Sequence, residues 1–314
     1  MPQYRITYID YAKAICIFLM IVGHWTDNST LFTYIYSFHM PALFVISGIL
    51  FKQNLWYITV GCFFIPIIFF SLMNLSVQIL IEEVELKNIT FHSIFFGIFH
   101  YRYGLSNGLF VGDWFLWALI GLRFVFGDIK YFSKLRNFYC PLAILCVIYM
   151  TFEYYLINLD ILFRGYLVGK MVPCMVFFCT GFYLKDHHWD PTSISNSNII
   201  LLTIIFIVMP LLNGRCDILD NNYGLSYILF VANALLSTIL LFSICSKFPS
   251  NKFIKTISKG SLVVLGTHIP LLHSLNYIFS GKMSATYPII TIILCFFIIT
   301  ILEKHIPILL GRWR

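Results

Sequence analysis

The sequence predicts an all-α integral membrane protein, a bundle of about ten transmembrane helices with cytoplasmic N- and C-termini. Of its 314 residues, 59% are hydrophobic and only 11% are charged, whereas soluble domains are about 45–50% apolar and about 25% charged. The mean hydropathy is +0.84. A soluble fold of this size could not bury so much apolar surface, so lipid is the expected solvent.

Ten segments are long and apolar enough to cross the hydrocarbon core, for which about 20 residues suffice. They are 9–25, 38–52, 56–81, 113–127, 138–158, 164–184, 198–213, 223–246, 260–280 and 286–306. The shorter apolar segment 92–104 contains two glycines and is predicted to be re-entrant or interfacial. We expect one membrane domain that spans residues 1–314.

Positive charge is distributed unevenly between the predicted loops. Lys and Arg gather in alternate loops, as in the basic loop Lys247–Lys259, and the positive-inside rule then places both termini in the cytoplasm. The formal charge of +7 is scattered along the chain without a dense basic block. We therefore expect no nucleic-acid partner.

The first predicted helix carries three ionisable residues, which are expensive inside a membrane and therefore suggest function. At 100° per residue, Asp10, Lys13 and His24 fall on one stripe, with Lys13 and His24 roughly 16 Å apart along the axis. The alternative is that Asp10 and Lys13 pair at the cytoplasmic interface while His24 caps the other end.

The second predicted helix opens near Ser37, the expected N-cap, with Pro41 in its first turn. His39 then lies at the same depth as His24, so the two imidazoles could face each other and accept a proton from a hydroxyl. The alternative is an interfacial histidine with a backbone partner. Ser47–Gly48 is predicted to let another helix approach closely.

Four further residues stand out in the later spans. Asp113 is expected to be an N-cap, and Trp114 to anchor the helix at the interface. Arg123 either snorkels to the cytoplasm or binds phosphate. His268 lies mid-membrane, where it serves chemistry or forms a helix–helix hydrogen bond near Pro270.

Several kinds of site are not expected. The nine cysteines form no CxxC pair and no Cys/His metal spacing, so we interpret them as small core residues. We predict no metal site. The sequence also contains no P-loop, nucleophile elbow or dinucleotide fingerprint.

Four segments together resemble the acyltransferase-3 family of integral membrane O-acyltransferases. They are Ile9–Lys13 with Val22–His24, Ser37–Phe51, Asp113–Trp117 and Ile254–Leu272. The resemblance, to the branch that O-acetylates polysaccharides or fucose-type sugars, implies a multi-pass protein of the plasma (inner) membrane. It also implies transfer of an acyl group, commonly acetyl, from cytoplasmic acyl-CoA to a hydroxyl of a cell-surface polysaccharide, such as O-antigen or capsule, or of its lipid-linked sugar precursor. Acetyl-CoA is then the donor substrate, membrane lipid a partner, and no cofactor is permanently bound.

The resemblance also assigns roles to residues. His24 is the expected catalytic residue, acting with Asp10 and Lys13. Where many members carry an Arg-x-x-Arg or basic cluster after the second helix, this chain has only Lys52, followed by Gln53 and Asn54. The candidate acyl-CoA-binding residues are Lys52, Arg123, Lys255 and Lys259, and the candidate acceptor-binding residues are His39, Asp113, Trp114 and His268.

Two mechanisms and two other functions stay open at this point. His24 could act as general base in direct transfer, or an acyl-histidine could carry the acyl group. A transporter of glycans or lipid-linked sugars would use the same polar core as a permeation path, although no inverted repeat is visible in the sequence. A non-catalytic subunit of a polysaccharide assembly machine would tolerate loss of His24.

Overall fold

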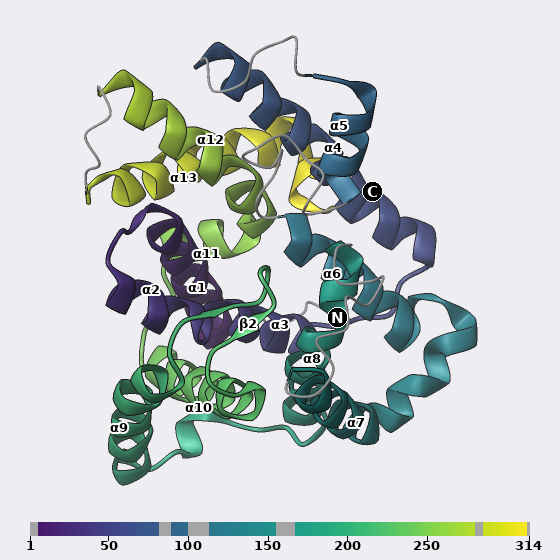
Figure 1. Ribbon diagram of the computed structural model, residues 1–314, viewed down its shortest axis with the longest axis vertical. Coiled ribbons are helices and arrows are strands. Elements are labelled where there is room, and N and C mark those ends of the chain that lie inside the picture. The colour runs from purple at the N-terminus through teal and green to yellow at the C-terminus, as the bar shows by residue number, and fades with distance from the viewer. Residues whose placement is uncertain (1–5, 82–88, 100–112, 155–166, 280–284, 313–314) are drawn as a thin grey trace. The chain divides into compact units, whose positions relative to one another are not determined.

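The computed structural model describes residues 6–81, 89–99, 113–154, 167–279 and 285–312, and Figure 1 labels its helices. The chain forms two compact units, which are described separately. The first comprises Met1–Lys52, Phe138–Leu159 and Pro173–Lys259, and the second comprises Gln53–Asn137, Asp160–Val172 and Gly260–Arg314.

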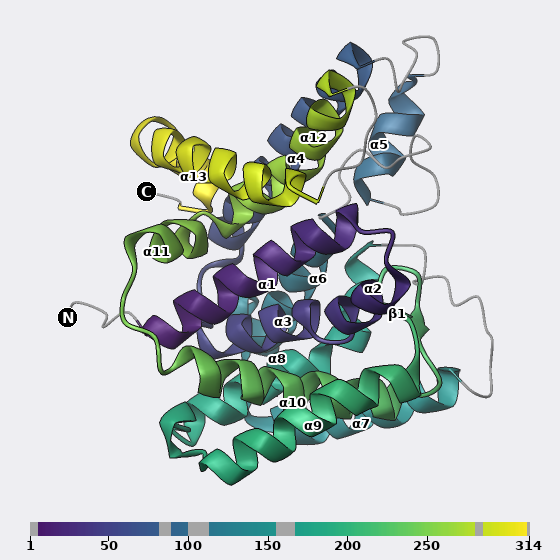
Figure 2. The same ribbon diagram turned by 90° about the vertical axis from the view of Figure 1, so that its left-hand side faces the viewer.

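In its described part, the first unit contains eight α-helices and a short hairpin. They are α1 (Thr7–Trp25), α2 (Ser29–Tyr36), α3 (His39–Ile49), α7 (Tyr139–Phe152), α8 (Met171–Asp186), α9 (Asn196–Asn213), α10 (Tyr227–Cys245), α11 (Lys252–Lys259), and strands β1 (Cys216–Asp217) and β2 (Asn222–Tyr223). Helix α3 is buried over almost its whole length. Helix α1 packs against α3, α10 and α11, and α9 lies along α10 (Figure 2).

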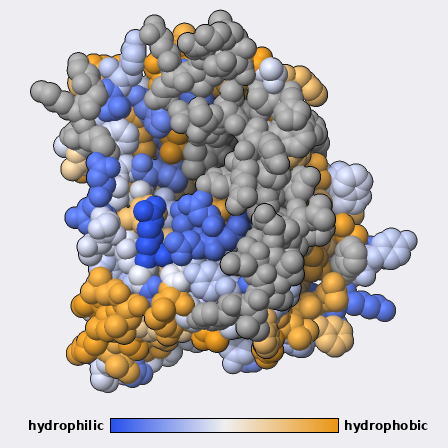
Figure 3. All heavy atoms as spheres, viewed as in Figure 1, coloured by the Kyte–Doolittle hydropathy of each residue, from blue (hydrophilic) through white to orange (hydrophobic). Residues whose placement is uncertain are grey.

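Helix α9 shows why lipid is the solvent of this unit. Its exposed large residues recur at spacings of three and four, which places them on one helical face. Figure 3 shows apolar atoms gathered where Figure 1 draws this helix. The exposed residues are Ile200, Leu201, Ile204, Ile207, Val208, Leu211 and Leu212.

The second unit contains five α-helices in its described part. They are α4 (Trp56–Leu80), α5 (Phe91–Phe99), α6 (Asp113–Arg123), α12 (Ser261–Ile278) and α13 (Tyr287–His305). Helix α6 continues into a π-helical turn, Phe124–Asp128. Helix α12 packs against both α4 and α13. Gly266 makes the first of these contacts possible, because a Cβ atom there would lie 2.2 Å from Cγ of Phe70.

The helical class that the sequence predicts is confirmed, and seven helical segments are long and apolar enough to cross a membrane. The other three predicted spans contain helices α6, α8 and α12, which are not among the seven. The predicted segment 92–104 is helical as far as Phe99. Its remainder, and the predicted span ends at 155–158 and 164–166, lie outside the described residues.

Two local predictions were wrong, and one short helix was missed. The prediction that Ser37 caps the second helix fails because its hydroxyl donates to the carbonyl of Tyr34 (2.8 Å), at the end of α2. Helix α2 itself was not predicted; Asn28 caps it by accepting from the N–H of Leu31 (2.9 Å). The segment predicted as a basic loop instead contains helix α11, in which Ile257 is buried.

The prediction of close packing at Gly48 is confirmed. A Cβ atom at Gly48 would lie 2.2 Å from the carbonyl oxygen of Phe178, and one at Gly181 would lie 2.2 Å from that of Val45. The backbones of helices α3 and α8 are therefore in direct contact. This contact is possible because both residues that meet there, Gly48 and Gly181, are glycines.

We expect the substitution Gly48→Ala to lower the free energy of unfolding by about 1–3 kcal/mol, the usual cost of overpacking, because a backbone carbonyl cannot move aside as a side chain can. Thermal unfolding in detergent would measure this loss. Ser47→Ala is the matched control, since it removes only a hydroxyl that donates to Leu43 one turn earlier. Equal effects from the two substitutions would contradict the close contact.

Candidate functional site

Helix α1 carries polar side chains at both ends, and each end meets different elements of the first unit. At the N-terminal end, the buried Asp10 accepts a hydrogen bond from Oγ of Ser258 (2.6 Å). The hydroxyl of Tyr11 donates to the carbonyl of Pro249 (2.8 Å). These contacts hold helix α11 against α1, so that the lysines of α11 share one region with Asp10 and Lys13.

The C-terminal end of α1 carries His24, and helix α2 approaches it closely. A Cβ atom at Gly23 would lie 2.8 Å from Cε2 of Tyr36, so the glycine makes room for this ring. The Tyr36 ring stands edge-on to the imidazole of His24, with centroids 6.3 Å apart and planes at 77°. It also stands edge-on to the imidazole of His39, at 5.1 Å and 68°.

The structure therefore brings His24 and His39 together, as their matching depth predicts, and the two imidazoles interact electrostatically. His39 is buried, and its Nδ1 lies 2.6 Å from the carbonyl oxygen of Ile35. Because a carbonyl oxygen only accepts, Nδ1 carries a proton, and in the neutral imidazole Nε2 then has the lone pair. The backbone partner predicted as an alternative is present, and it leaves the other ring nitrogen able to accept a proton. His24 is half-buried.

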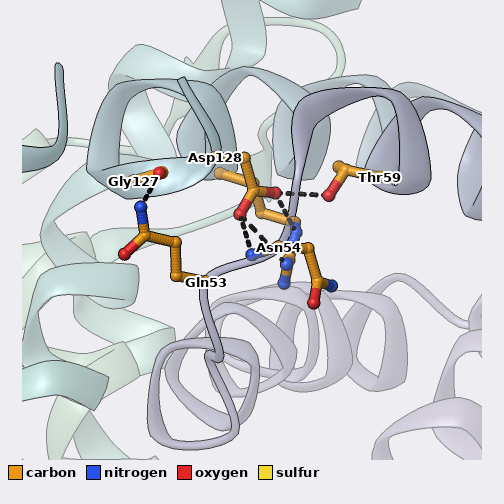
Figure 4. A network of polar contacts seen from close by, with 6 residues as sticks. Gln53, Asn54, Thr59, Gly127 and Asp128 are labelled. Carbon is orange, nitrogen blue, oxygen red and sulfur yellow. Dashed lines mark hydrogen bonds and ion pairs between the residues drawn. The ribbon is translucent and has the colours of Figure 1, made fainter. Parts of the chain in front are cut away.

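A polar network around Asp128 lies at the start of α4, entirely within the second unit (Figure 4), and Arg123 takes part in it. Its Nε donates to Oδ2 of the buried Asp128 (2.9 Å), and its Nη2 lies 3.4 Å from Oδ1. Asp128 also accepts from the hydroxyl of Thr59 and from the N–H of Asn54 (2.8 Å). A buried carboxylate with this many donors fixes the turn that leads into α4.

The same network ties the π-helical turn to that segment. Nε2 of Gln53 donates to the carbonyl of Gly127 (2.5 Å), and Gly127 has a φ of 157°, which a side chain would disfavour. Arg123 is thus neutralised by Asp128, and a neutralised guanidinium attracts phosphate less than a free cation. Its predicted contact with acyl-CoA stays a prediction. Lys52, Lys252 and Lys259 are exposed.

The other candidate acceptor residues belong to the second unit. Asp113 begins helix α6, where the sequence predicts the N-cap, but its side chain lies outside the described part. Trp114 is buried, at 7% exposure. His268 is fully buried in α12, and its Nδ1 lies 2.9 Å from the carbonyl oxygens of Val264 and Leu265. This partner is within the helix, not on a neighbouring helix.

Sequence reasoning missed several polar residues that the fold buries. Tyr36 resembles any interfacial tyrosine, and only the packing at Gly23 reveals its place between the histidines. Asp128 follows a glycine at the end of a span, which is an ordinary turn signal. For α4 the sequence did contain a signal of a buried polar face, because three polar residues recur at helical spacing within an apolar run. They are Ser71, Asn74 and Gln78.

Comparison with known protein families gives one finding. The sequence model of a family described as an acyltransferase domain matches residues 6–303, nearly the whole chain. Searches among curated proteins and among solved structures gave no match. Within the described ranges, no three His, Cys, Asp or Glu side chains are grouped so that they could hold a metal ion.

We expect that Arg123→Met lowers the free energy of unfolding by about 3 kcal/mol, because it leaves the buried Asp128 without its cation, and that Asp128→Asn, which leaves the half-buried Arg123, lowers it by about 2 kcal/mol. The double variant should lose less than the sum of the two, and unfolding in mixed micelles would give all three values. The exposed pair Arg312–Glu303, with the same 2.9 Å separation, is the control. Its loss in Arg312→Met should be below about 1 kcal/mol. Equally small losses at both pairs would contradict a structural role for the network.

Proposed function

Since the chain belongs to the acyltransferase-3 family and is a multi-pass membrane acyltransferase, we propose that it is an O-acetyltransferase. It moves an acetyl group from cytoplasmic acetyl-CoA to a hydroxyl of a cell-surface polysaccharide or of its lipid-linked precursor. The observation that carries this proposal is the arrangement of α1, with two imidazoles at one end and a helix bearing three lysines at the other.

The two ends of α1 suit the two halves of acetyl-CoA. The phosphates of CoA are separated from its thioester by a long pantetheine arm, and Lys13 and His24 are roughly 16 Å apart along the helix axis. Lysines attract phosphate as point charges. We assign the phosphates to the cations near the Asp10 end, with Lys255 and Lys259 on α11 and Lys52 as candidates.

In the proposed reaction, the imidazole of His24 accepts the proton of the acceptor hydroxyl. The oxygen attacks the thioester carbonyl carbon and forms a tetrahedral intermediate. Its collapse breaks the carbon–sulfur bond and releases the CoA thiolate, which takes the proton from the imidazolium. The products are an O-acetyl ester and CoA thiol, and such a general base typically accelerates a reaction 10²–10⁴-fold.

His39 and Tyr36 support His24 in this scheme. The Tyr36 ring limits the orientations open to both imidazoles. A protonated His24 is disfavoured beside a second cation, and His39, buried with one ring nitrogen already donating, provides a neutral neighbour. The same residues permit an acyl-histidine on His24, from which the acetyl group passes to the hydroxyl in a second step.

We expect His24→Ala to abolish O-acetylation of the host's surface polysaccharide, because the general base is lost. The measurement compares the O-acetyl content of the polysaccharide in wild type, a gene deletion and His24→Ala, at equal protein level in the membrane. His305→Ala is the control, since His305 is an exposed histidine at the end of α13, and it should acetylate normally.

The same experiment separates the enzyme from a transporter or assembly subunit. A full amount of exported polysaccharide without acetyl ester, in both the deletion and His24→Ala, supports the acetyltransferase. A deletion that leaves acetylation unchanged but reduces the exported polysaccharide would contradict it and favour transport or assembly.

A further inference from the structure

The segment between α9 and α10 is a rigid hairpin. Its strands pair Cys216 with Tyr223 and Asp217 with Asn222. The buried Asn213 holds its base, because its Nδ2 donates to the carbonyl of Tyr223 (2.9 Å) and its Oδ1 accepts from the N–H of Ser226 (3.0 Å). A loop held in this way can present side chains in a defined position.

The hairpin contacts helix α2 at the His24 end of the first unit. The guanidinium of Arg215 lies over the ring of Phe32, 4.2 Å from its centroid, which is a cation–π contact. Phe32 stacks on Tyr36 with centroids 3.7 Å apart. Because Tyr36 also contacts His24 and His39, one continuous column of planar groups connects the hairpin to the two imidazoles.

Two carboxylates complete this region. Asp220 is exposed and Asp217 half-buried, and both, like Arg215, interact electrostatically with the Tyr36 hydroxyl. Oδ1 of Asp217 accepts from the N–H of Leu219 (2.9 Å). Figure 3 shows hydrophilic atoms gathered where Figure 1 draws the hairpin.

Asp217 weakens the fold slightly. Burial first, and the neighbouring Asp220 carboxylate second, raise the pKa of Asp217 to about 6, against the opposing effects of backbone N–H groups and Arg215. Because folding raises this pKa, the carboxyl stabilises the folded state at a pH below the pKa that it has in the unfolded chain. This stabilising contribution is lost as the pH rises through about 6. A charge kept near Tyr36 at such a cost is more typical of a functional site than of a scaffold.

We propose that the hairpin is the acceptor-recognition element of the enzyme, and that Asp217 and Asp220 bind the hydroxyls of an uncharged sugar next to the position that is acetylated. This inference rests on the proposed function. Carboxylates accept hydrogen bonds from sugar hydroxyls, and the Phe32–Tyr36 column connects these two carboxylates to the imidazoles. Two carboxylates against the single guanidinium of Arg215 leave a net negative charge among these three residues, which disfavours an anionic sugar such as a uronic or sialic acid.

The test uses the full chain in liposomes, acetyl-CoA as donor, and the host's surface polysaccharide with its esters removed by alkali as acceptor. We expect Asp217→Asn and Asp220→Asn each to raise the KM for the polysaccharide about tenfold, as loss of a charged hydrogen-bond acceptor implies. The kcat and the KM for acetyl-CoA should change less than twofold. Asp190→Asn is the matched control. Asp190 is an exposed carboxylate beyond the other end of α9, a helix of 18 residues and so about 27 Å long.

The pH dependence gives a second readout. In wild type the KM for the polysaccharide should rise as pH falls through about 6, because Asp217 becomes protonated, and in Asp217→Asn this rise should be smaller. Besides Asp217, the groups that face this carboxyl are Asp220, Arg215 and Tyr36. Asp217→Asn should also be at least as stable as wild type at pH 8, which separates lost binding from lost folding.

The proposal is overturned if both hairpin variants keep the wild-type KM, or if they lower kcat and stability together. It is also overturned if NMR of the product places the new ester on an acidic sugar. If the wild type transfers no acetyl group to the polysaccharide at all, the proposed function fails and this inference falls with it. Transfer that needs His24 but ignores both carboxylates would refute the hairpin's role alone.

Discussion

The packing of helix α2 against α1 at Gly23 is the contact on which the histidine end of the first unit depends. A Cβ atom there would lie 2.8 Å from the ring of Tyr36 and 3.2 Å from Cγ2 of Ile35. Without this approach, Tyr36 could not stand against both imidazoles, and the column that runs from the hairpin would end at Phe32. Both atoms that a side chain at residue 23 would meet belong to side chains and not to the backbone, so this constraint sets the geometry of the site more than the stability of the fold.

Helix α1 has two ends of different character, and these suit the two proposed substrates. Lipid cannot solvate a charge, so ionisable groups gather at the helix ends or find partners within the protein. Asp10 finds its partner in Ser258 of helix α11, and this hydrogen bond brings the three lysines of α11 to one end of α1. At the other end, the imidazoles meet a polar hairpin with two carboxylates. A cationic end suits CoA phosphates, and an end with bases and hydrogen-bond acceptors suits a sugar hydroxyl.

The sequence alone predicts the helical membrane class and the proximity of His24 and His39, because hydropathy and helical period are local properties of the chain. It could not predict contacts that join distant segments. Ser258 and Asp10 are 248 residues apart, and neither residue signals the other. Helices α2 and α11 were missed because eight residues are too few for a clear periodic pattern. The pairing of Arg123 with Asp128 depends on a kink at Gly127, where the backbone is not helical, and sequence spacing at 3.6 residues per turn does not reveal such a kink.

The most direct test of the central claim is the acetyl-transfer rate of Gly23→Ala, measured beside its thermal unfolding midpoint. The added methyl group should displace Tyr36 and leave the helices packed, and a shift of about 1 Å near reacting groups can cost as much as 10²-fold in rate. We predict a transfer rate at least tenfold below wild type, with an unfolding midpoint close to that of wild type. A variant that transfers acetyl groups at the wild-type rate would contradict the claim that the Gly23 contact organises the catalytic end of α1.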